Sequence, residues 1–370
     1  MTSLALTELT LSHFRSHKLA RLSCGPLPVA IHGPNGAGKT NILEAVSLFS
    51  PGRGMRRASA EEMTRRPEAL GWKVSGVLQA QGQSHEIEFW SENGAARSTK
   101  VNSKPVAQNR LAELSRVLWL IPAMDRLWIE GADGRRRFLD RMALSFFPNH
   151  AEASLTYEKT MRERNRLLKE NVRDPMWYGV LETRLAQTGA VIHENRVATL
   201  AFLSDAQMQA ETAFPTADLE LIHSEDAMPA DSADLKSAFE ASRFRDLAAG
   251  RTLVGPHRAD LYGVFTAKGV PAKDCSTGEQ KALLISLILA NARALAVQIG
   301  APPILLLDEV AAHLDSARRA ALYTEISALG AQAWMTGTEP ALFDSLTGPA
   351  VHIEVTESAG VSETKVIPRT

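Results

Sequence analysis

The amino-acid sequence predicts an α/β fold that a long helical stretch interrupts. A β-branched, apolar run at 29–31 leads into a glycine-rich loop, GPNGAGKT at 33–40, and then into a segment with helical spacing. A second apolar run, ILLLDE at 304–309, ends in two acids, as is typical of a buried parallel strand. Residues 135–205 carry long helical patterns, and alternating α/β character returns after about residue 250. The helical stretch is therefore an insertion in an α/β protein.

The first third of the chain is expected to hold several strands around one helix. Leucines alternate over residues 4–11, as in an edge or half-buried strand, and a second strand follows. Apolar residues at helical spacing over 42–49 predict a helix that a Ser-Pro-Gly sequence stops. Alternating runs within 72–91 predict an antiparallel hairpin, and the run at 117–121 predicts a buried strand closed by a proline.

The middle of the chain is expected to be helical. Helical patterns cover residues 135–147, 152–172 and 176–203, and Asp174-Pro175 separates the last two, which predicts a pair of antiparallel helices forming an arm. The acidic, proline-punctuated stretch 205–235 is expected to be irregular. The last third is expected to contain a turn and strand within 252–265, a long helix at 279–298, the run at 304–309 and a final core strand within 331–338.

The composition is ordinary, but its charges are segregated. The 370 residues are 45% hydrophobic and 22% charged. No run approaches the roughly 20 apolar residues of a membrane span and no secretion signal precedes the first strand, so we expect a cytoplasmic protein. Cys24 and Cys275 are too few for a disulfide framework and are expected to be buried thiols. The net charge of −1 argues against attraction of nucleic acid by the whole surface, yet arginines cluster locally.

The loop at 33–40 fits the phosphate-binding pattern G-x-x-x-x-G-K-[ST]. Its glycines let successive N–H groups point at phosphates, and the helix that follows adds the positive end of its dipole. Lys39 would neutralise the β- and γ-phosphates, and we expect it to face the surface. The Thr40 hydroxyl would bind Mg²⁺. A glycine turn with a chance lysine is the alternative. The predicted ATP-binding residues are Gly33, Pro34, Asn35, Gly36, Ala37, Gly38, Lys39, Thr40 and Asn41.

The two acids after the apolar run at 304–307 complete a predicted catalytic set. Asp308 would hold Mg²⁺, directly or through water, beside Thr40. Glu309 would polarise the water that attacks the γ-phosphate. Alone, such a run is weak evidence because many strands end at solvent. Together with a phosphate loop it predicts Lys39, Asp308 and Glu309 as catalytic residues, with Thr40 and Asp308 as magnesium ligands.

A second anion site is predicted at STGEQK, where a loop meets the long helix. Ser276, Thr277, Gly278 and Glu279 open that helix, whose N-terminal dipole favours phosphate. Because Lys39 already supplies one complete site, a second γ-phosphate site makes sense if it serves another chain. The alternative is an ordinary helix cap, Ser/Thr followed by Glu.

These motifs together resemble the ABC ATPase heads. GPNGAGKT, STGEQK, LLLDE and HLD at 313–315 are similar to their Walker A, signature, Walker B and D-loop motifs, and Asp315 is then the D-loop aspartate. Among these heads, the single chain with a short helical arm resembles the RecF family of bacterial recombination mediators. The further motifs that carry this resemblance are FRSHKL, GADGRRRFLD at 131–140, RNRLL at 164–168, GPHRADL at 255–261 and TGT at 336–338.

The resemblance implies an ABC-type P-loop ATPase head with a mixed sheet and an antiparallel β lobe, plus an inserted helical arm domain. Residues 1–121 with 250–370 would form the head and 122–249 the arm. It also implies a weak, DNA-stimulated ATPase that uses ATP and Mg²⁺ to form a homodimer on duplex DNA near single-stranded gaps. RecR and RecO would be partners in loading RecA. Thr336 and Thr338 fall where transporters carry a switch histidine, which suggests slow turnover.

Two basic segments are candidates for contact with DNA phosphates. One lies at 53–66, which has no apolar face, and the other lies in the arm. Solvated surface is the alternative for both. The candidate residues are Arg53, Arg56, Arg57, Arg65, Arg66, Arg162, Arg164 and Arg166.

Two other functions compete with this interpretation. A transporter's ATPase subunit would have only a short segment between the phosphate loop and STGEQK, whereas a basic helical arm intervenes here. A DNA-tethering head related to SMC or Rad50 proteins would need an arm of many heptads, whereas the predicted helices are only about 30–40 Å long. Retention by membranes or by DNA would separate the first alternative from the DNA-binding ATPase.

Overall fold

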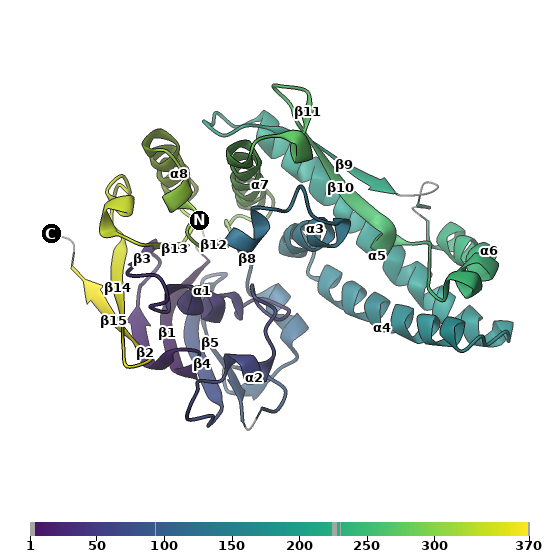
Figure 1. Cartoon of the computed structure of the whole chain (residues 1–370), viewed down its shortest axis with the longest axis horizontal. Coiled ribbons are helices and arrows are strands. Elements are labelled where there is room, and N and C mark those ends of the chain that lie inside the picture. The colour runs from purple at the N-terminus through teal and green to yellow at the C-terminus, as the bar shows by residue number, and fades with distance from the viewer. Residues whose placement is uncertain (1–3, 93, 224–227, 230, 369–370) are drawn as a thin grey trace. The chain divides into compact units, whose positions relative to one another are not determined.

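The computed structural model (Figure 1) describes residues 4–92, 94–223, 228–229 and 231–368. The chain divides into two compact units: Met1–Asp125, Ala206–Pro215 and Lys281–Thr370 form unit 1, and Arg126–Asp205 and Thr216–Gln280 form unit 2. This division differs from the predicted domain boundaries. Residues 250–280, expected in the head, belong to unit 2 because strand β10 (Ala259–Phe265) pairs with β9 (Ala217–His223).

Unit 1 contains a six-stranded sheet whose central strands are parallel. Its order is β15-β14-β3-β13-β12-β8, with β15 antiparallel to β14. β3 and β12 are buried along their whole length, as expected for parallel strands covered on both faces. The strands are β3 (Val29–His32), β8 (Val117–Leu120), β12 (Ile304–Leu307), β13 (Ala333–Gly337), β14 (Val351–Ser358) and β15 (Val361–Ile367). The helices α1 (Lys39–Ser47) and α8 (Ser316–Leu329) also belong to this unit.

A second, antiparallel sheet forms the β lobe of unit 1, with order β2-β1-β4-β5-β6-β7. One hydrophobic core joins the two sheets around α1, where the rings of Phe49 and Phe89 meet edge to face at 5.1 Å. The elements are β1 (Ala5–Phe14), β2 (His17–Ser23), α2 (Ala60–Met63), β4 (Trp72–Ala80), β5 (Gln83–Ser91), β6 (Ser98–Val101), β7 (Lys104–Pro105) and the 3₁₀ turns Gln108–Glu113 and Pro122–Met124.

The described residues of unit 2 form four α-helices and a three-stranded sheet. Helices α4 and α5 run side by side and antiparallel (Figure 1), as Asp174-Pro175 predicts. Their buried residues, among them Tyr157 and Leu185, form a core with Leu235 and Phe239 of α6. The elements are α3 (Ala132–Phe146), α4 (Asn149–Lys169), α5 (Pro175–Met208), β9 (Ala217–His223), α6 (Ser232–Ala249), β10 (Ala259–Phe265) and β11 (Val270–Pro271), with 3₁₀ turns at Pro256–Arg258 and Ala272–Asp274.

Several sequence-based expectations differ from the structure. The 4–11 strand is half-buried, which is one of the two expected forms, but it is not an edge, because β1 pairs with both β2 and β4. Among its described residues, the stretch 205–235 contains strand β9 and the start of α6, whereas 224–227 and 230 lie outside the described residues. Asp231 caps the N-terminus of α6 by accepting from the N–H groups of Ala233 and Asp234. The final core strand is followed by the hairpin of β14 and β15, and β14 adds to the parallel sheet beside β3.

Helix α7 (Thr277–Gln298) is the most apolar long segment of the chain. By length and composition alone it could cross a membrane, although Ser286, Asn291 and Arg293 interrupt its apolar runs. Its most apolar window is 83% buried inside the protein, as in the core helix of a soluble domain. Both cysteines are buried free thiols, as predicted, and burial raises the pKa of Cys24 to about 12.

Candidate nucleotide-binding site

The two nucleotide motifs lie at the same edge of the parallel sheet. The phosphate loop follows β3, the acidic pair follows β12, and β13 pairs with both strands. Because the carboxyl ends of parallel strands meet at one edge, residues far apart in sequence are brought together there. The hydroxyl of Thr40 donates a 3.0 Å hydrogen bond to Asp308 Oδ1, which places the predicted magnesium ligands in contact.

The glycines of the loop have the backbone that the motif requires. Gly33, Gly36 and Gly38 have φ angles of 149°, 83° and 103°, which side-chain-bearing residues rarely adopt. A Cβ on Gly33 would also lie 2.0 Å from the carbonyl oxygen of Val355. Helix α1 starts directly after Gly38, and no side chain caps it among the described residues. The N–H groups of Lys39 and Thr40 are therefore available to an anion, whereas that of Asn41 donates to the carbonyl oxygen of Gly38 at 3.1 Å.

Lys39 is buried, so the expectation that it faces the surface is wrong. Its side chain is only 4% exposed, and Nζ donates to the carbonyl oxygens of Gly33 at 2.7 Å and Pro34 at 2.8 Å. Burial lowers the pKa of the ammonium, and the charges of Glu309 and Asp308 oppose that shift. The carbonyls of the loop itself thus hold the cation that the motif assigns to phosphate.

Thr336, at the end of β13, links the two acids of the second motif. Its hydroxyl donates to Asp308 Oδ1 at 2.7 Å and accepts from the backbone N–H of Glu309 at 2.9 Å. Asp308 Oδ1 therefore receives two hydroxyl donors, one from each side of the site. Glu309 is half-buried and has a φ of 53°, a left-handed conformation that is strained for a residue with a side chain. Thr336 stabilises that conformation through the Glu309 N–H.

The turn after β1 adds polar groups beside the phosphate loop that the sequence did not assign to the site. Asn41 donates to Ser16 Oγ at 2.7 Å, and Arg15 donates to both carboxylate oxygens of buried Glu44. A cleft of about 540 Å³ opens here, with Arg15, Ser16, Asn41 and Arg56 among its lining residues. The FRSHKL motif was the signal for this turn, but it did not indicate which residues would lie beside α1.

The STGEQK residues form a helix cap that is open to solvent. Glu279 Oε2 accepts from the N–H and the hydroxyl of Ser276, at 2.9 and 2.8 Å, which completes a capping box. The hydrogen bond from Lys268 lowers the pKa of Glu279 to about 2. Ser276, Thr277 and Gly278 are exposed. The helix cap, which was predicted as the alternative, is therefore present. The role of the exposed residues before Glu279 in binding an anion stays a prediction.

Asp315, the predicted D-loop aspartate, also caps a helix. Asp315 Oδ1 accepts from the backbone N–H of Arg318 at 2.8 Å, at the start of α8. Its side chain is 61% exposed. The capping bond uses Oδ1, and Oδ2 pairs with Arg318 Nε at 3.8 Å, so Arg318 contacts both carboxylate oxygens.

The donor set near β3 and β12 fits the predicted cofactors. Thr40 and Asp308 offer a hydroxyl and a carboxylate in direct contact, and hard oxygen donors of this kind suit Mg²⁺. The uncapped start of α1 and the Lys39 ammonium suit the phosphates of ATP. The residues that the sequence predicted for ATP and Mg²⁺ are therefore compatible with both.

The candidate DNA-binding arginines divide into exposed and buried side chains. Arg53, Arg57, Arg66, Arg162 and Arg166 are exposed, and Arg56 is 40% exposed with bonds to Asn41 and Glu44. Arg65 is buried and donates to the carbonyl oxygens of Ser16 and Gly360, so its assignment to DNA is wrong. The 53–66 segment also has an apolar side after all, because Met55 and Met63 join the core.

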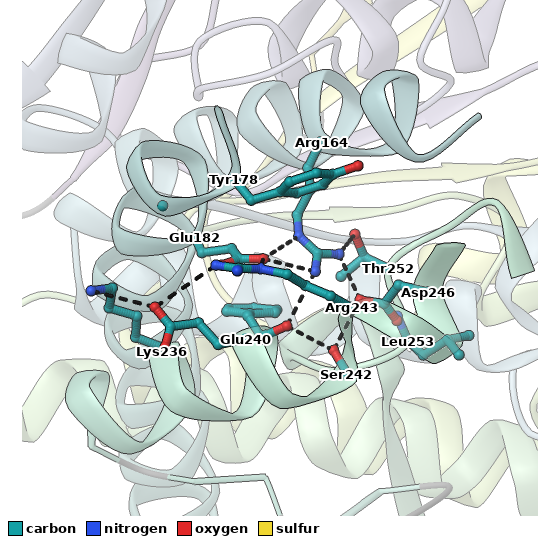
Figure 2. Close-up of polar contacts among 12 residues, drawn as sticks. Arg164, Tyr178, Glu182, Lys236, Glu240, Ser242, Arg243, Asp246, Thr252 and Leu253 are labelled. Atoms are coloured by element: carbon teal, nitrogen blue, oxygen red, sulfur yellow. Dashed lines mark hydrogen bonds and ion pairs between the residues drawn. The ribbon is translucent and has the colours of Figure 1, made fainter. Parts of the chain in front are cut away.

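Arg164 is the second arginine wrongly assigned to DNA. It is fully buried in unit 2, where it donates to Glu182 at 3.0 Å and to Asp246 at 2.7 Å (Figure 2). The ring of Tyr178 lies over its guanidinium, and Arg243 pairs with the same Glu182. Its neighbours two residues away point to the opposite, exposed face of the helix. A basic stretch in the sequence therefore contains one structural arginine between two solvent-facing ones.

The remaining motifs join parts of unit 2. Arg135, from GADGRRRFLD, binds Asp260 of GPHRADL through two hydrogen bonds of 2.7 and 2.8 Å. His257 of the same motif bonds the hydroxyl of Tyr157 and the carbonyl oxygen of Thr252, at 2.8 and 3.0 Å. Burial lowers the pKa of His257 to about 4. These motifs are explained by packing of the unit around β10.

Comparison with known proteins shows where the chain belongs. The family described as RecF/RecN/SMC N terminal domain matches residues 5–348. The DNA replication and repair protein RecF of Caulobacter vibrioides is 44% identical, with 96% of this chain and 97% of that protein covered. The RecF of Brucella suis is 42% identical over 96% and 95% of the two chains. The chain belongs to the RecF family. The fold is accordingly an ABC-type ATPase head with mixed α/β sheets.

Solved structures support the same family and fold. The structure described as the recombination mediator protein RecF-ATP in the RecFOR pathway is 25% identical, has a TM-score of 0.84 and covers 98% of each chain. An SMC head domain derived from Pyrococcus furiosus has a TM-score of 0.58 at 17% identity, which shows a shared fold. Membership in the RecF family excludes the transporter subunit.

Proposed function

We propose that this chain is an ATP-dependent DNA-binding protein of recombinational repair and replication-fork maintenance. In this proposal it works in the cytoplasm, dimerises with ATP on duplex DNA near single-stranded gaps, and helps RecR and RecO load RecA. The contact between Thr40 and Asp308 carries the nucleotide part of the proposal, because it unites the two halves of the site across 268 residues of sequence. The relatives named RecF and the ATP-bound relative support the remainder.

The residues of the site divide the work by position. Gly33, Gly36, Gly38 and the first turn of α1 bind phosphate through backbone N–H groups, and Lys39 turns from its loop carbonyls to the phosphates. Thr40 and Asp308 hold Mg²⁺, which would neutralise charge on the phosphates. Glu309 accepts a proton from the attacking water or orients it, with Thr336 holding its backbone in place.

Turnover is proposed to be slow and to serve association. The exposed Ser276, Thr277 and Gly278 would complete the ATP site of a second copy, so ATP joins two chains while it is intact. Hydrolysis then releases them. The arm helices α4 and α5 have 21 and 34 residues, and α5 is longer than the sequence indicated. Helices of this length are too short for long-distance tethering of the SMC type.

The test compares molecular mass with and without ATP, on blunt and on gapped duplex DNA. The parent protein should become dimeric on DNA when ATP is present. Lys39→Ala should lose this response, whereas Glu309→Gln should bind ATP, hydrolyse it slowly and stay dimeric on DNA, because a carboxamide cannot accept the proton of the attacking water. Hydrolysis by Glu309→Gln at the parent rate would refute the role of Glu309, and a parent protein indifferent to ATP would refute the function.

A further inference from the structure

Helix α4 presents a row of cations on the face opposite its buried side. Lys159, Arg162, Arg166 and Lys169 recur at spacings of three and four residues, so they share one face, and all four are exposed. Arg173, exposed in the turn that follows, continues the row. We call these five residues the basic row. Among the residues that the structure describes, none of the five has an ion-pair partner.

The basic row differs from the usual solvated face of a helix. Surface helices commonly place a carboxylate four residues from each cation, and the pairs stabilise the helix. Glu158, Glu163 and Glu170 lie at such positions, yet none of them forms an ion pair within the described part of the chain. Glu182 of α5 and Asp246 of α6 form their ion pairs with the buried Arg164, on the other side of the helix. The row therefore keeps an excess of positive charge, with five cations near four carboxylates, those of Glu158, Glu163, Glu170 and Asp174.

The dimensions of the row suit a regular polyanion. From Lys159 to Lys169 the helix rises about 15 Å. Double-stranded DNA presents one phosphate for about every 1.7 Å of its axis, so several phosphates would lie within reach. Because these cations have no internal ion pairs, none has to be broken before they pair with phosphates.

An aromatic side chain stands at the end of the row, on the first turn of α5. Trp177 is 64% exposed, and Met176 and Val180 beside it are 81% and 75% exposed. The turn is held firmly: Asp174 accepts from the N–H of Met176 at 2.9 Å, and the hydroxyl of the buried Tyr178 donates to the carbonyl oxygen of Val172 at 2.9 Å. The indole is thus presented to solvent from an ordered helix start.

We propose that this end of the arm binds a junction between duplex and single-stranded DNA. The basic row contacts phosphates of the duplex, and Trp177 stacks on an unpaired base where the duplex ends, with Met176 and Val180 excluding water from the stacked pair. The proposal rests on the DNA binding proposed above. Four unpaired cations spread along about 15 Å of helix, with a fifth in the turn that follows, favour DNA over an acidic peptide, which would need only the few charges next to the apolar residues.

The first experiment measures how affinity for blunt duplex depends on salt, with ATP present. Arg162→Gln/Arg166→Gln/Lys169→Gln should flatten the log–log slope by about 0.9 for each phosphate that the variant no longer neutralises. The matched control is Lys18→Gln/Arg21→Gln/Lys104→Gln, three exposed cations of the β lobe, which should leave the slope near that of the parent. An unchanged slope in the first variant, with normal binding by the parent, would overturn the role of the row.

The second experiment tests Trp177 with a duplex that carries a single-stranded extension. Trp177→Ala should weaken binding to this DNA by about tenfold and leave blunt duplex binding unchanged, because one base stack is removed. Trp177→Phe should keep most of the affinity. In the parent, the single-stranded extension should quench the fluorescence of the Trp177 indole. Trp177→Phe should abolish this quenching, because the variant lacks that indole.

The outcomes separate this inference from the function on which it rests. A parent protein that does not bind DNA with ATP refutes both. A parent protein that binds, with Trp177→Ala equal to it on every DNA, refutes the stacking role alone. If Trp177→Ala instead loses association with purified RecR or RecO, the apolar end is a protein-docking surface and the proposal is wrong.

Discussion

Thr336 shows how one hydroxyl can control two acidic groups. It donates to the Asp308 carboxylate and accepts from the Glu309 N–H, and Glu309 has a backbone conformation that needs support. Valine has nearly the same shape but neither bond. In Thr336→Val, a half-buried N–H loses its acceptor and Asp308 loses one of two donors.

We expect Thr336→Val to bind ATP but to hydrolyse it more slowly, because Glu309 is no longer held in place. Stability should fall by about 1–3 kcal/mol, as when other buried hydrogen bonds are removed. Single-turnover hydrolysis and urea unfolding measure the two effects, and Thr336→Ser, which keeps the hydroxyl, is the control. Parent-like hydrolysis by the valine variant would show that Glu309 does not depend on this contact.

The motif residues could be predicted from sequence, and their supports could not. Lys39, Thr40 and Asp308 follow from fixed spacings that the chemistry of phosphate and Mg²⁺ requires. Thr336 contributes one hydroxyl from a separate strand, and no spacing connects it to Asp308. The buried position of Lys39 could not be predicted either, because the loop carbonyls that bind it converge only once the loop has folded.

At the scale of elements, the arm is held by buried charges. Arg164 of α4 joins Glu182 of α5 and Asp246 of α6 with all three side chains fully buried (Figure 2). Such a network adds little net stability over apolar packing, but removal of one partner leaves uncompensated charge in a dry interior.

We expect Arg164→Met to destabilise unit 2 by about 3–5 kcal/mol, because Asp246 loses its cation and Glu182 keeps only Arg243. Arg162→Met, two residues away on the exposed face, is the matched control and should change stability by less than about 0.5 kcal/mol. Adding Glu182→Gln and Asp246→Asn to Arg164→Met should recover part of the loss. Equal urea midpoints for the two single variants would contradict this account.

Elements with a strong internal pattern were predicted, and those defined by their neighbours were not. The hairpin at 72–91 and the long helices of the arm have clear periodicity, and the structure contains them. Strands β9 and β14 become strands by pairing with β10 and β3, far away in sequence. Arg164 and Arg162 look alike in sequence, and only the core formed by α4, α5 and α6 distinguishes them.

At the scale of the whole molecule, the division of the chain follows contacts rather than composition. The sequence of residues 250–280 has α/β character, and for that reason we predicted that they belong to the head. In the structure they belong to unit 2, because β10 pairs with β9 and Arg135 binds Asp260. The signature residues 276–279 therefore belong to the unit that contains the arm, whereas the phosphate loop belongs to unit 1.

The shared ATP site is tested by mixing two damaged chains. Ser276→Arg should bind ATP nearly as the parent does, because its own phosphate loop is unchanged, but it should not dimerise, since a bulky cation replaces an exposed hydroxyl at both sites of a symmetric pair. Lys39→Ala should also fail to dimerise, but for the opposite reason: its signature residues are intact, whereas its phosphate loop lacks the lysine that pairs with phosphate.

A mixture of the two variants can form a pair in which both lesions fall in the same site. The other site then combines the intact loop of the Ser276→Arg chain with the intact signature residues of the Lys39→Ala chain. Light scattering with ATP and duplex DNA should therefore detect association in the mixture that neither variant shows alone. The double variant Lys39→Ala/Ser276→Arg, mixed with either single variant, leaves no intact site and should stay monomeric. A mixture of the two single variants that is as inactive as this control would exclude a site shared between chains, because each ATP would then be held by one chain alone.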